Sequence, residues 1–147
     1  DEPTTALDVT VQAQILDLMQ QLKEEFGTAI ILISHDLGII AETVERIVVM
    51  YAGKVVEEGP SLSVFDAPKH PYTKGLFKSR PKIGERSQFG RRRLLEIQGA
   101  VPNLFHLPGG CSFHTRCVEA VETCRQTSPE LISTSDNRKV RCHLANP

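Results

Sequence analysis

The sequence predicts an α/β fold followed by a small, irregular α+β extension, and three observations lead to this prediction. An amphipathic helical pattern over residues 9–26 precedes a continuous apolar run, "AIILIS" at residues 29–34. Two further strand-like runs flank Ala52-Gly53, and all four cysteines lie between residues 111 and 142. The helix with its apolar run and the two strand-like runs are typical of a domain of helices on a sheet. The clustered cysteines mark a separate local structure near the C-terminus.

The composition is that of a globular protein without polyelectrolyte character. Hydrophobic residues make up 40% of the chain, and 17 basic side chains face 18 acidic ones. This balance gives no reason to expect binding to nucleic acid or to an anionic membrane. No apolar run approaches the roughly 20 residues that span a bilayer, and the first residues lack the basic and apolar regions of a signal peptide. We therefore expect a cytosolic protein.

The elements of the α/β part can be predicted in order. Asp8 is suited to cap a helix whose apolar positions recur until Gly27. The β-branched run at 29–34 predicts a strand buried on both faces, as in a parallel sheet. A helix-like segment follows at residues 35–45, and "RIVVMYAGKVVEEG" at residues 46–59 predicts a β-hairpin.

The pattern changes at Gly59-Pro60, where we place a boundary between domains 1–60 and 61–147. Two short helical segments punctuated by prolines follow between residues 61 and 81. Residues 82–93 are polar and predict a surface loop. The segment "GRRRLL" at 90–95 contains clustered arginines, which can neutralise phosphates. No aromatic residues interleave with them for base stacking, so we favour a solvated surface and expect no nucleic acid partner.

Several motifs in order resemble those of a known family. "DEPTTALD", then "LISHD", then "VVMYAGKVVEEG" resemble the second half of the nucleotide-binding domain of an ABC transporter ATPase. "HPYTKGLF", "GCSFHTRCVEAVETC" and "VRCH" resemble the C-terminal extension of the oligopeptide/dipeptide importer ATPases. The resemblance covers nearly the whole chain. It implies the C-terminal part of a RecA-like P-loop NTPase sheet over 1–60 and a four-cysteine extension over 61–147.

The chain opens with two carboxylates, Asp1 and Glu2, that suit phosphate chemistry. Mg²⁺ binds one or two carboxylates together with substrate phosphates, so Asp1 can hold the metal of Mg-ATP. Glu2 faces the other way in an extended chain and can polarise a water for attack on the γ-phosphate. The resemblance implies the same roles for these residues, and it implies that Asp8 belongs to the nucleotide site and signals across a dimer of ATPase domains. The alternative is that acidic residues simply favour the positive end of the following helix.

His35 directly follows the predicted strand, at an end where open α/β sheets place ligand-binding groups. Its imidazole can donate a hydrogen bond to a phosphate oxygen without a permanent charge. A histidine at such a position can equally cap a helix or pack in part against the sheet. The resemblance implies that His35 is the catalytic switch histidine that senses the γ-phosphate.

A phosphate-binding loop of the form GxxxxGK[ST] does not occur in the 147 residues, and the ABC signature and glutamine loop are also absent. Such a loop supplies backbone N–H groups and a lysine to the β- and γ-phosphates. The sequence therefore predicts a catalytic half without its binding half. We expect the intact parent to be an ATPase and this chain alone to be inactive.

The four cysteines are Cys111, Cys117, Cys124 and Cys142, with the spacing C-x5-C-x6-C-x17-C. This is neither a common zinc spacing nor that of bacterial ferredoxins. If residues 117–124 are helical, Cys117 and Cys124 are separated by about 10.5 Å along the axis, which excludes a disulfide between them and strains a single zinc site. We expect all four to be metal ligands, to a 4Fe-4S cluster first, as some members of the family carry, and to zinc second; free thiols or disulfides are the third possibility. His114 and His143 are possible substitute ligands.

These observations lead to one functional hypothesis and one alternative. The hypothesis is a fragment of the ATP-hydrolysing subunit of an importer for peptides or related solutes, with ATP and Mg²⁺ as ligands of the intact protein. The resemblance implies a second ATPase subunit, in a homo- or heterodimer, two membrane permease subunits and, indirectly, an extracytoplasmic solute-binding protein. It also implies a cytoplasmic, peripheral location on the inner face of the cell membrane. The alternative is a stand-alone metal-binding interaction module without catalysis.

Overall fold

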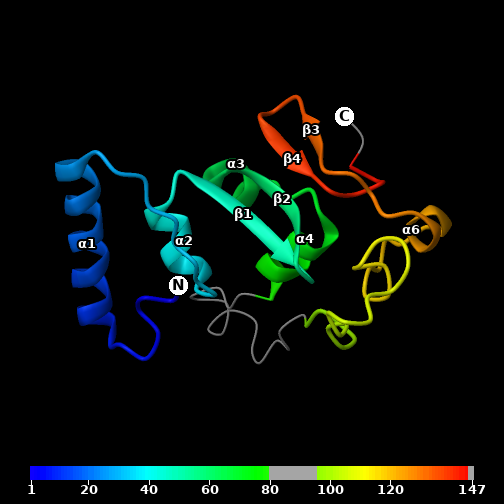
Figure 1. Cartoon of the computed structure of the whole chain (residues 1–147), viewed down its shortest axis with the longest axis horizontal. Helices are drawn as coiled ribbons and strands as arrows, with labels where there is room; N and C mark the ends of the chain where they lie inside the picture. Colours follow the sequence, from blue (N-terminus) through cyan, green and yellow to red (C-terminus); the bar gives the residue numbers. More distant parts are fainter. Residues whose placement is uncertain (80–95, 146–147) are drawn as a thin grey trace, which may run out of the picture. The chain divides into compact units, whose positions relative to one another are not determined.

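A computed structural model describes residues 1–79 and 96–145 of the protein. The chain folds as two compact units, Asp1–Val44 and Glu45–Pro147 (Figure 1). The predicted loop at 82–93 and the arginine segment at 90–95 lie outside the described residues. None of the helices in the described part of the chain is long and apolar enough to cross a membrane.

The first unit contains two helices, α1 (Val9–Phe26) and α2 (Leu37–Thr43). Asp8 caps α1, because its Oδ1 accepts hydrogen bonds of 3.0 Å from the amides of Thr10 and Val11. Gly27 ends α1 in the left-handed conformation with φ 60°, which a glycine adopts without steric cost. Both ends of the first predicted helix and the existence of the second are therefore confirmed.

The predicted buried strand at residues 29–34 is not present. These residues have no strand pairing among the described ones, and the side chain of Ile31 is 90% exposed. A strand buried on both faces requires a paired neighbour on each side. Among the described residues, the backbone of this segment accepts a hydrogen bond of 2.8 Å from the Glu2 amide at the Ile33 carbonyl and pairs with no strand. The side chains of Ile30, Ile31 and Ile33 are exposed.

The second unit is built on a four-stranded antiparallel sheet with the strand order β1-β2-β4-β3 (Figure 1). β1 (Arg46–Tyr51) and β2 (Lys54–Pro60) form the predicted hairpin. Ala52 and Gly53 turn the chain with φ values of 47° and 76°, the positive angles that tight hairpin turns require. The remaining helices of the described segments are α3 (Ser61–Asp66), α4 (Pro71–Lys78) and α6 (Glu122–Gln126). The two short helices predicted after Pro60 are thus confirmed as α3 and α4.

A second hairpin, which the sequence analysis did not predict, completes the sheet. It consists of β3 (Ile132–Thr134) and β4 (Arg138–Val140), and β4 also pairs with β2. Asn137 lies in the turn between them with a φ of 57°, a conformation that asparagine tolerates better than most residues. Through this pairing, the C-terminal hairpin is joined to β2 of the first hairpin.

This pairing changes the predicted organisation. The hairpin 46–60, which we expected in the first domain, lies in the same compact unit as the extension, and the division falls between Val44 and Glu45. The sheet is antiparallel, so the described residues do not contain the parallel sheet of a RecA-like domain. The assignment of residues 1–60 to such a domain stays a prediction about a longer chain.

A buried ion pair lies at the centre of the second unit. The Glu57 side chain is fully buried and accepts hydrogen bonds of 2.9 Å from the amides of Lys69 and His70. Arg138 is 4% exposed; its guanidinium lies 3.7 Å from Glu57 and donates to the carbonyls of Ser63 and Ala67 at 2.9 and 2.6 Å. Burying two charges is tolerated only when they are paired and hydrogen-bonded, as they are here.

A β-bulge explains why Glu57 points inward. The register of β1 and β2 shifts between Val49 and Met50, so that Val49 pairs with Glu57 and Met50 with Val55. Residue 56 has no partner in β1, and Val56 and Glu57 are both buried although they are consecutive. A bulge interrupts the alternation of faces in this way.

Candidate functional site

Glu2 and His35 lie together in the first unit. The His35 Nδ1 atom lies 2.8 Å from Glu2 Oε1, and the Thr5 hydroxyl donates a hydrogen bond of 2.9 Å to Glu2 Oε2. Both side chains are accessible, with 75% of the His35 side chain and 43% of the Glu2 side chain exposed. The structure therefore brings together the two residues that the sequence predicts as catalytic.

Backbone hydrogen bonds position this pair. The Glu2 amide donates to the carbonyl of Ile33 at 2.8 Å, and because Ile33 lies two residues before His35, this bond holds Glu2 close to the histidine. The Thr5 amide donates to the Glu2 carbonyl at 3.2 Å. Glu2 has a φ of 41°, in the left-handed region that residues other than glycine rarely adopt. Unfavourable backbone angles that the surrounding contacts maintain are found preferentially at functional sites.

The two side chains stabilise each other's charged forms. The pKa of Glu2 is lowered by the hydrogen bond from His35 and, to a smaller extent, by the one from Thr5. The pKa of His35 is raised by the same hydrogen bond and by the charge of Glu2. A carboxylate only accepts hydrogen bonds, so His35 Nδ1 carries the shared proton.

This arrangement changes one expectation for His35. With its Nδ1 proton directed to Glu2, a neutral imidazole has no proton on Nε2. Donation from Nε2 to a phosphate oxygen then requires the imidazolium form, which the raised pKa favours. We had expected donation from the uncharged ring; the geometry supports donation from the charged one.

Asp1 directly precedes Glu2 and Asp8 follows it by six residues, and both aspartates are exposed. Asp8 caps α1 as described above. This contact agrees with the helix-terminus alternative for that residue, and it leaves the predicted nucleotide roles of Asp1 and Asp8 as proposals.

The cysteine region differs from the prediction in its local structure. α6 begins only at Glu122, so Cys124 lies on the helix and Cys117 lies in the turns that precede it. The helical separation of about 10.5 Å that we used for these two cysteines is therefore wrong, because it required a continuous helix. The argument from that separation against zinc or a disulfide no longer applies.

The four thiols are free and lie within the second unit, where Cys124 is buried and the other three are half-buried. The Cys111 amide donates to the Cys124 carbonyl at 2.8 Å, and the Leu144 amide donates to the sulfur of Cys142 at 3.4 Å. Burial raises the pKa of Cys111, and burial raises the pKa of Cys117 to about 11, with smaller contributions to both from other thiols of the set. For Cys111 and Cys117, the thiol form is therefore favoured at neutral pH.

The described residues contain no group of three or more histidine, cysteine, aspartate or glutamate side chains that could hold a metal ion. The predicted cluster or zinc site is thus not supported by this arrangement of the thiols. His114 Nδ1 lies 2.8 Å from the Cys111 carbonyl, and His143 Nε2 lies 2.9 Å from the Thr127 carbonyl. Each proposed substitute ligand uses one ring nitrogen for a backbone contact.

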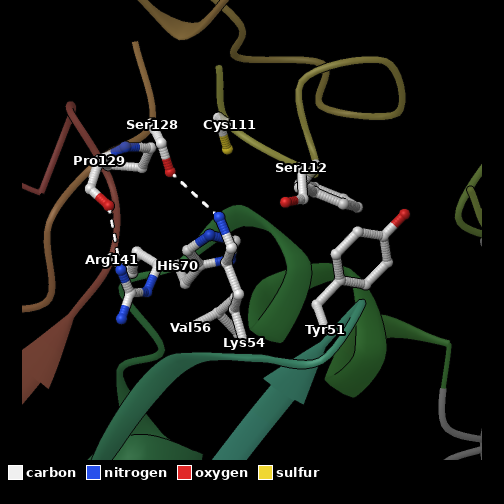
Figure 2. A pocket seen from close by; sticks show the side chains of 10 residues that line it. Tyr51, Lys54, Val56, His70, Cys111, Ser112, Ser128, Pro129 and Arg141 are labelled. Atoms are coloured by element: carbon white, nitrogen blue, oxygen red, sulfur yellow. Dashed lines mark hydrogen bonds between the residues drawn. The ribbon is translucent and has the colours of Figure 1, made fainter. Parts of the chain in front are cut away.

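A small cavity lies beside Cys111 (Figure 2). Its volume is about 10 Å³, which is close to the minimum for one water molecule. Lys54 Nζ reaches Ser128 Oγ at 3.4 Å, and Arg141 donates to the Pro129 carbonyl at 3.2 Å across its rim. The cavity is too small to bind a nucleotide or a peptide.

Sequence reasoning missed the contact of Thr5 with Glu2. The signal was available, because a threonine three residues after a glutamate in a tight turn can reach its carboxylate, as Ser and Thr side chains do in local turns. The buried pair Glu57–Arg138 was also missed, because its partners are far apart in the sequence and the bulge that turns Glu57 inward has no clear sequence pattern.

Comparison with known proteins identifies the family. Residues 56–124 match the family model described as the oligopeptide/dipeptide transporter C-terminal region. The chain is 51% identical over 144 residues to a putative peptide import ATP-binding protein of Brucella ovis, covering 97% of this chain and 43% of that protein. It is 50% identical over 143 residues to the dipeptide transport ATP-binding protein DppD of Haemophilus influenzae, with 97% and 42% covered. It is 46% identical over 144 residues to the oligopeptide transport ATP-binding protein AppD of Bacillus subtilis, with 98% and 43% covered.

The match spans almost the whole of this chain but less than half the length of these curated relatives. A match of this length within 147 residues includes His35 and the cysteine region. The chain therefore belongs to the family of oligopeptide/dipeptide transporter ATP-binding proteins.

Proposed function

We propose that this chain is part of the ATP-hydrolysing subunit of an importer for peptides or related solutes. The observation that carries the proposal is the Glu2–His35 pair, in which a carboxylate and an imidazole from distant positions meet at 2.8 Å. The relatives named above are peptide import and transport ATP-binding proteins. This agreement does not favour the alternative of a stand-alone metal-binding module.

In the proposed reaction, Glu2 is the general base. Its lowered pKa keeps it ionised at neutral pH, so it can accept a proton from a water molecule. The water oxygen forms a bond to the γ-phosphorus, the bond from that phosphorus to the bridging oxygen breaks, and ADP leaves with the electron pair. Asp1 would hold the Mg²⁺ that neutralises the phosphate charge.

His35 has a separate role in the proposal. Its Nδ1 orients Glu2, and its Nε2 can donate to an oxygen of the γ-phosphate when the ring is protonated. A charged donor at that position stabilises the negative charge that the transferring phosphoryl group carries. Asp8 would act at the interface of two ATPase subunits.

The assembly around this subunit is also a proposal. A second ATP-binding subunit and two membrane permease subunits would complete the importer, and a solute-binding protein outside the cell would deliver the solute. The subunit would lie on the cytoplasmic side of the membrane. The names of the relatives support this assembly, because each is an ATP-binding protein of a transport or import system.

The experiment is steady-state ATP hydrolysis by the assembled importer that contains the full-length subunit. We expect Glu2→Gln to lower kcat by about a hundredfold or more while ATP binding persists, because general-base catalysis contributes about 10²–10⁴-fold. Asp1→Asn should instead raise the Mg²⁺ concentration needed for half-maximal rate. The control is Glu25→Gln, the same change at an exposed position on α1. Equal and mild effects of all three changes would contradict the catalytic roles and support the alternative that Asp1 and Glu2 only favour the positive end of the following helix.

For the cysteines, we keep a shared metal site as a proposal, with an iron–sulfur cluster first and zinc second. It is supported by the position of Cys111, Cys117, Cys124 and Cys142 in one compact unit, although the thiols would have to move to bind an ion together. Metal analysis and the visible absorption spectrum of protein purified without oxygen distinguish the possibilities. Brown protein with iron and sulfide supports a cluster, colourless protein with one zinc supports the second choice, and metal-free folded protein with four alkylated thiols rejects both.

A further inference from the structure

We infer that Thr5 is a positioning residue that, together with His35, holds the Glu2 carboxylate in its reactive orientation. This inference rests on the proposed function, because it concerns the same carboxylate. It adds a residue for which neither the motifs nor the comparisons suggest a role.

The geometry of the two contacts carries the inference. The Thr5 hydroxyl donates to Oε2 of Glu2 at 2.9 Å, and His35 Nδ1 meets Oε1 at 2.8 Å. The two oxygens of one carboxylate are therefore contacted from two different segments of the chain. A single hydrogen bond would leave the carboxylate free to rotate about the line of that bond, whereas two contacts on different oxygens fix its plane.

The segments that carry the two partners are themselves held against Glu2. The Thr5 amide donates to the Glu2 carbonyl at 3.2 Å, so the turn that presents the hydroxyl is closed by the backbone. The Glu2 amide donates to the Ile33 carbonyl at 2.8 Å, next to the segment that presents His35. Both partners are thus placed by hydrogen bonds that do not depend on their own side chains.

An oriented carboxylate still has room for the water that it must activate. Two carboxylate oxygens offer about four acceptor directions, of which Thr5 and His35 use two. The exposed 43% of the Glu2 side chain leaves the others open to solvent. Because general-base catalysis requires the base within hydrogen-bond reach of one particular water, loss of orientation should lower the rate of the chemical step and leave nucleotide affinity unchanged.

The test compares Thr5→Val with Thr5→Ser in the assembled importer that contains the full-length subunit. Valine has nearly the shape of threonine but no hydroxyl, and serine keeps the hydroxyl. We expect Thr5→Val to lower kcat about tenfold with an unchanged KM for ATP, and Thr5→Ser to stay within about twofold of the unchanged protein. The matched control is Thr4→Val, the same change one residue away, where the hydroxyl accepts from Gln12 and does not contact Glu2. We expect Thr4→Val to leave kcat unchanged.

A double-mutant cycle with Glu2→Gln adds a measurement that a merely structural effect would not reproduce. If Thr5 acts through Glu2, Thr5→Val should cause no further loss in the Glu2→Gln protein, so the two effects are not additive. A kcat of Thr5→Val equal to that of Thr4→Val, equal losses in Thr5→Val and Thr5→Ser, or a change confined to KM would each overturn the inference. If Glu2→Gln itself left hydrolysis intact, the proposed function would fail instead, so the two failures can be told apart.

Discussion

At the residue scale, the positions of the second unit whose substitution should affect stability most are those of buried polar side chains and their close neighbours. His70 is 1% exposed, its Nδ1 accepts from the Tyr72 amide at 3.0 Å, and its ring contacts the backbone of Arg141 through a further hydrogen bond. Burial lowers the pKa of His70 to about 4. The histidine is therefore neutral in the folded protein, where its ring acts as a fixed donor and acceptor between α4 and the C-terminal segment.

His70 should make the stability of the chain depend on pH. Its pKa falls from 6.5 in the unfolded chain to about 4 on folding. The contribution of the neutral His70 to the free energy of unfolding is therefore fully present above pH 6.5. It is lost as the pH falls toward 4, because the unfolded chain binds a proton that the folded chain does not. The full loss is on the order of 3 kcal/mol. Urea unfolding at several pH values measures it. His70→Gln should flatten this dependence, and an equal slope in both proteins would contradict the assignment.

Gly59 should tolerate no side chain, for a reason of space. A Cβ at this position would overlap Cγ of Arg138, whose buried guanidinium is held by several hydrogen bonds and cannot move away freely. Gly59→Ala should lower the free energy of unfolding by about 1–3 kcal/mol. The control is Gly109→Ala, whose Cβ would meet its nearest atom at an ordinary 3.9 Å. Urea unfolding compares the two variants, and equal stabilities would show that the Arg138 side chain is displaced easily.

At the element scale, the buried Arg138 joins three elements of the second unit and the turn between β3 and β4. It lies on β4, faces Glu57 on β2, and donates to backbone carbonyls at Ser63 in α3 and at Ala67, which follows that helix. Asp136 in the β3–β4 turn completes its contacts at 2.6 Å and also pairs with Lys69 at 3.0 Å. These contacts fix the position of the C-terminal hairpin on the sheet, although β3 and β4 have only three residues each.

Removal of the Arg138 charge should destabilise the second unit strongly. Arg138→Met keeps much of the length of the side chain but leaves the buried Glu57 charge without its cation, and breaking such a pair costs about 3–5 kcal/mol. The measurements are urea unfolding and hydrogen exchange at the amides of β4, which should lose protection first. Arg125→Met is the control, because Arg125 is exposed on α6 and lies 3.9 Å from Glu122; we expect a change within about 0.5 kcal/mol. Similar losses for both arginines would argue that the buried pair is not special.

At the scale of the whole molecule, the two units differ in how much apolar surface they bury. α1 has no buried residue, although Val9, Leu18 and Phe26 are among its apolar side chains. The second unit has a core formed by residues of the sheet, of α3 and α6, and of the cysteine region; it includes Ile47, Val49, Tyr51, Val56, Val64, Phe113, Cys124 and Val140. The stabilising hydrophobic burial of the chain is therefore concentrated after residue 45.

Hydrogen exchange of the 147-residue chain should reveal this difference directly. We expect the amides of α1 to exchange much faster than those of β1 and β2, because a helix that has no buried residue gains little stability from packing. Mass spectrometry of peptides from residues 9–26 and 46–60 compares the two. Equal protection of both peptides would show that α1 gains stability from contacts beyond those within its own unit.

Local patterns in the sequence determined the elements whose stabilising contacts lie within a few residues. Asp8 and Gly27 marked the ends of α1, Ala52-Gly53 marked the first hairpin, and prolines separated α3 from α4. Residues 29–34 were predicted wrongly, because an apolar run indicates a buried strand only where paired neighbours exist. The resemblance to a family of ATPases predicted catalytic roles for both Glu2 and His35, whereas their direct contact of 2.8 Å was not predicted.

Only the tertiary structure decided which distant groups meet. The contact of Glu57 with Arg138 depends on a bulge and on the pairing of β2 with β4, and neither can be read from local sequence. The same holds for the cysteines, where turns rather than a helix precede α6 and change the expected separation of Cys117 and Cys124. The physical reason is that helix caps and tight turns are stabilised by contacts between near neighbours in the chain, while strand pairing, buried charges and shared sites depend on contacts whose geometry arises only when the whole unit folds.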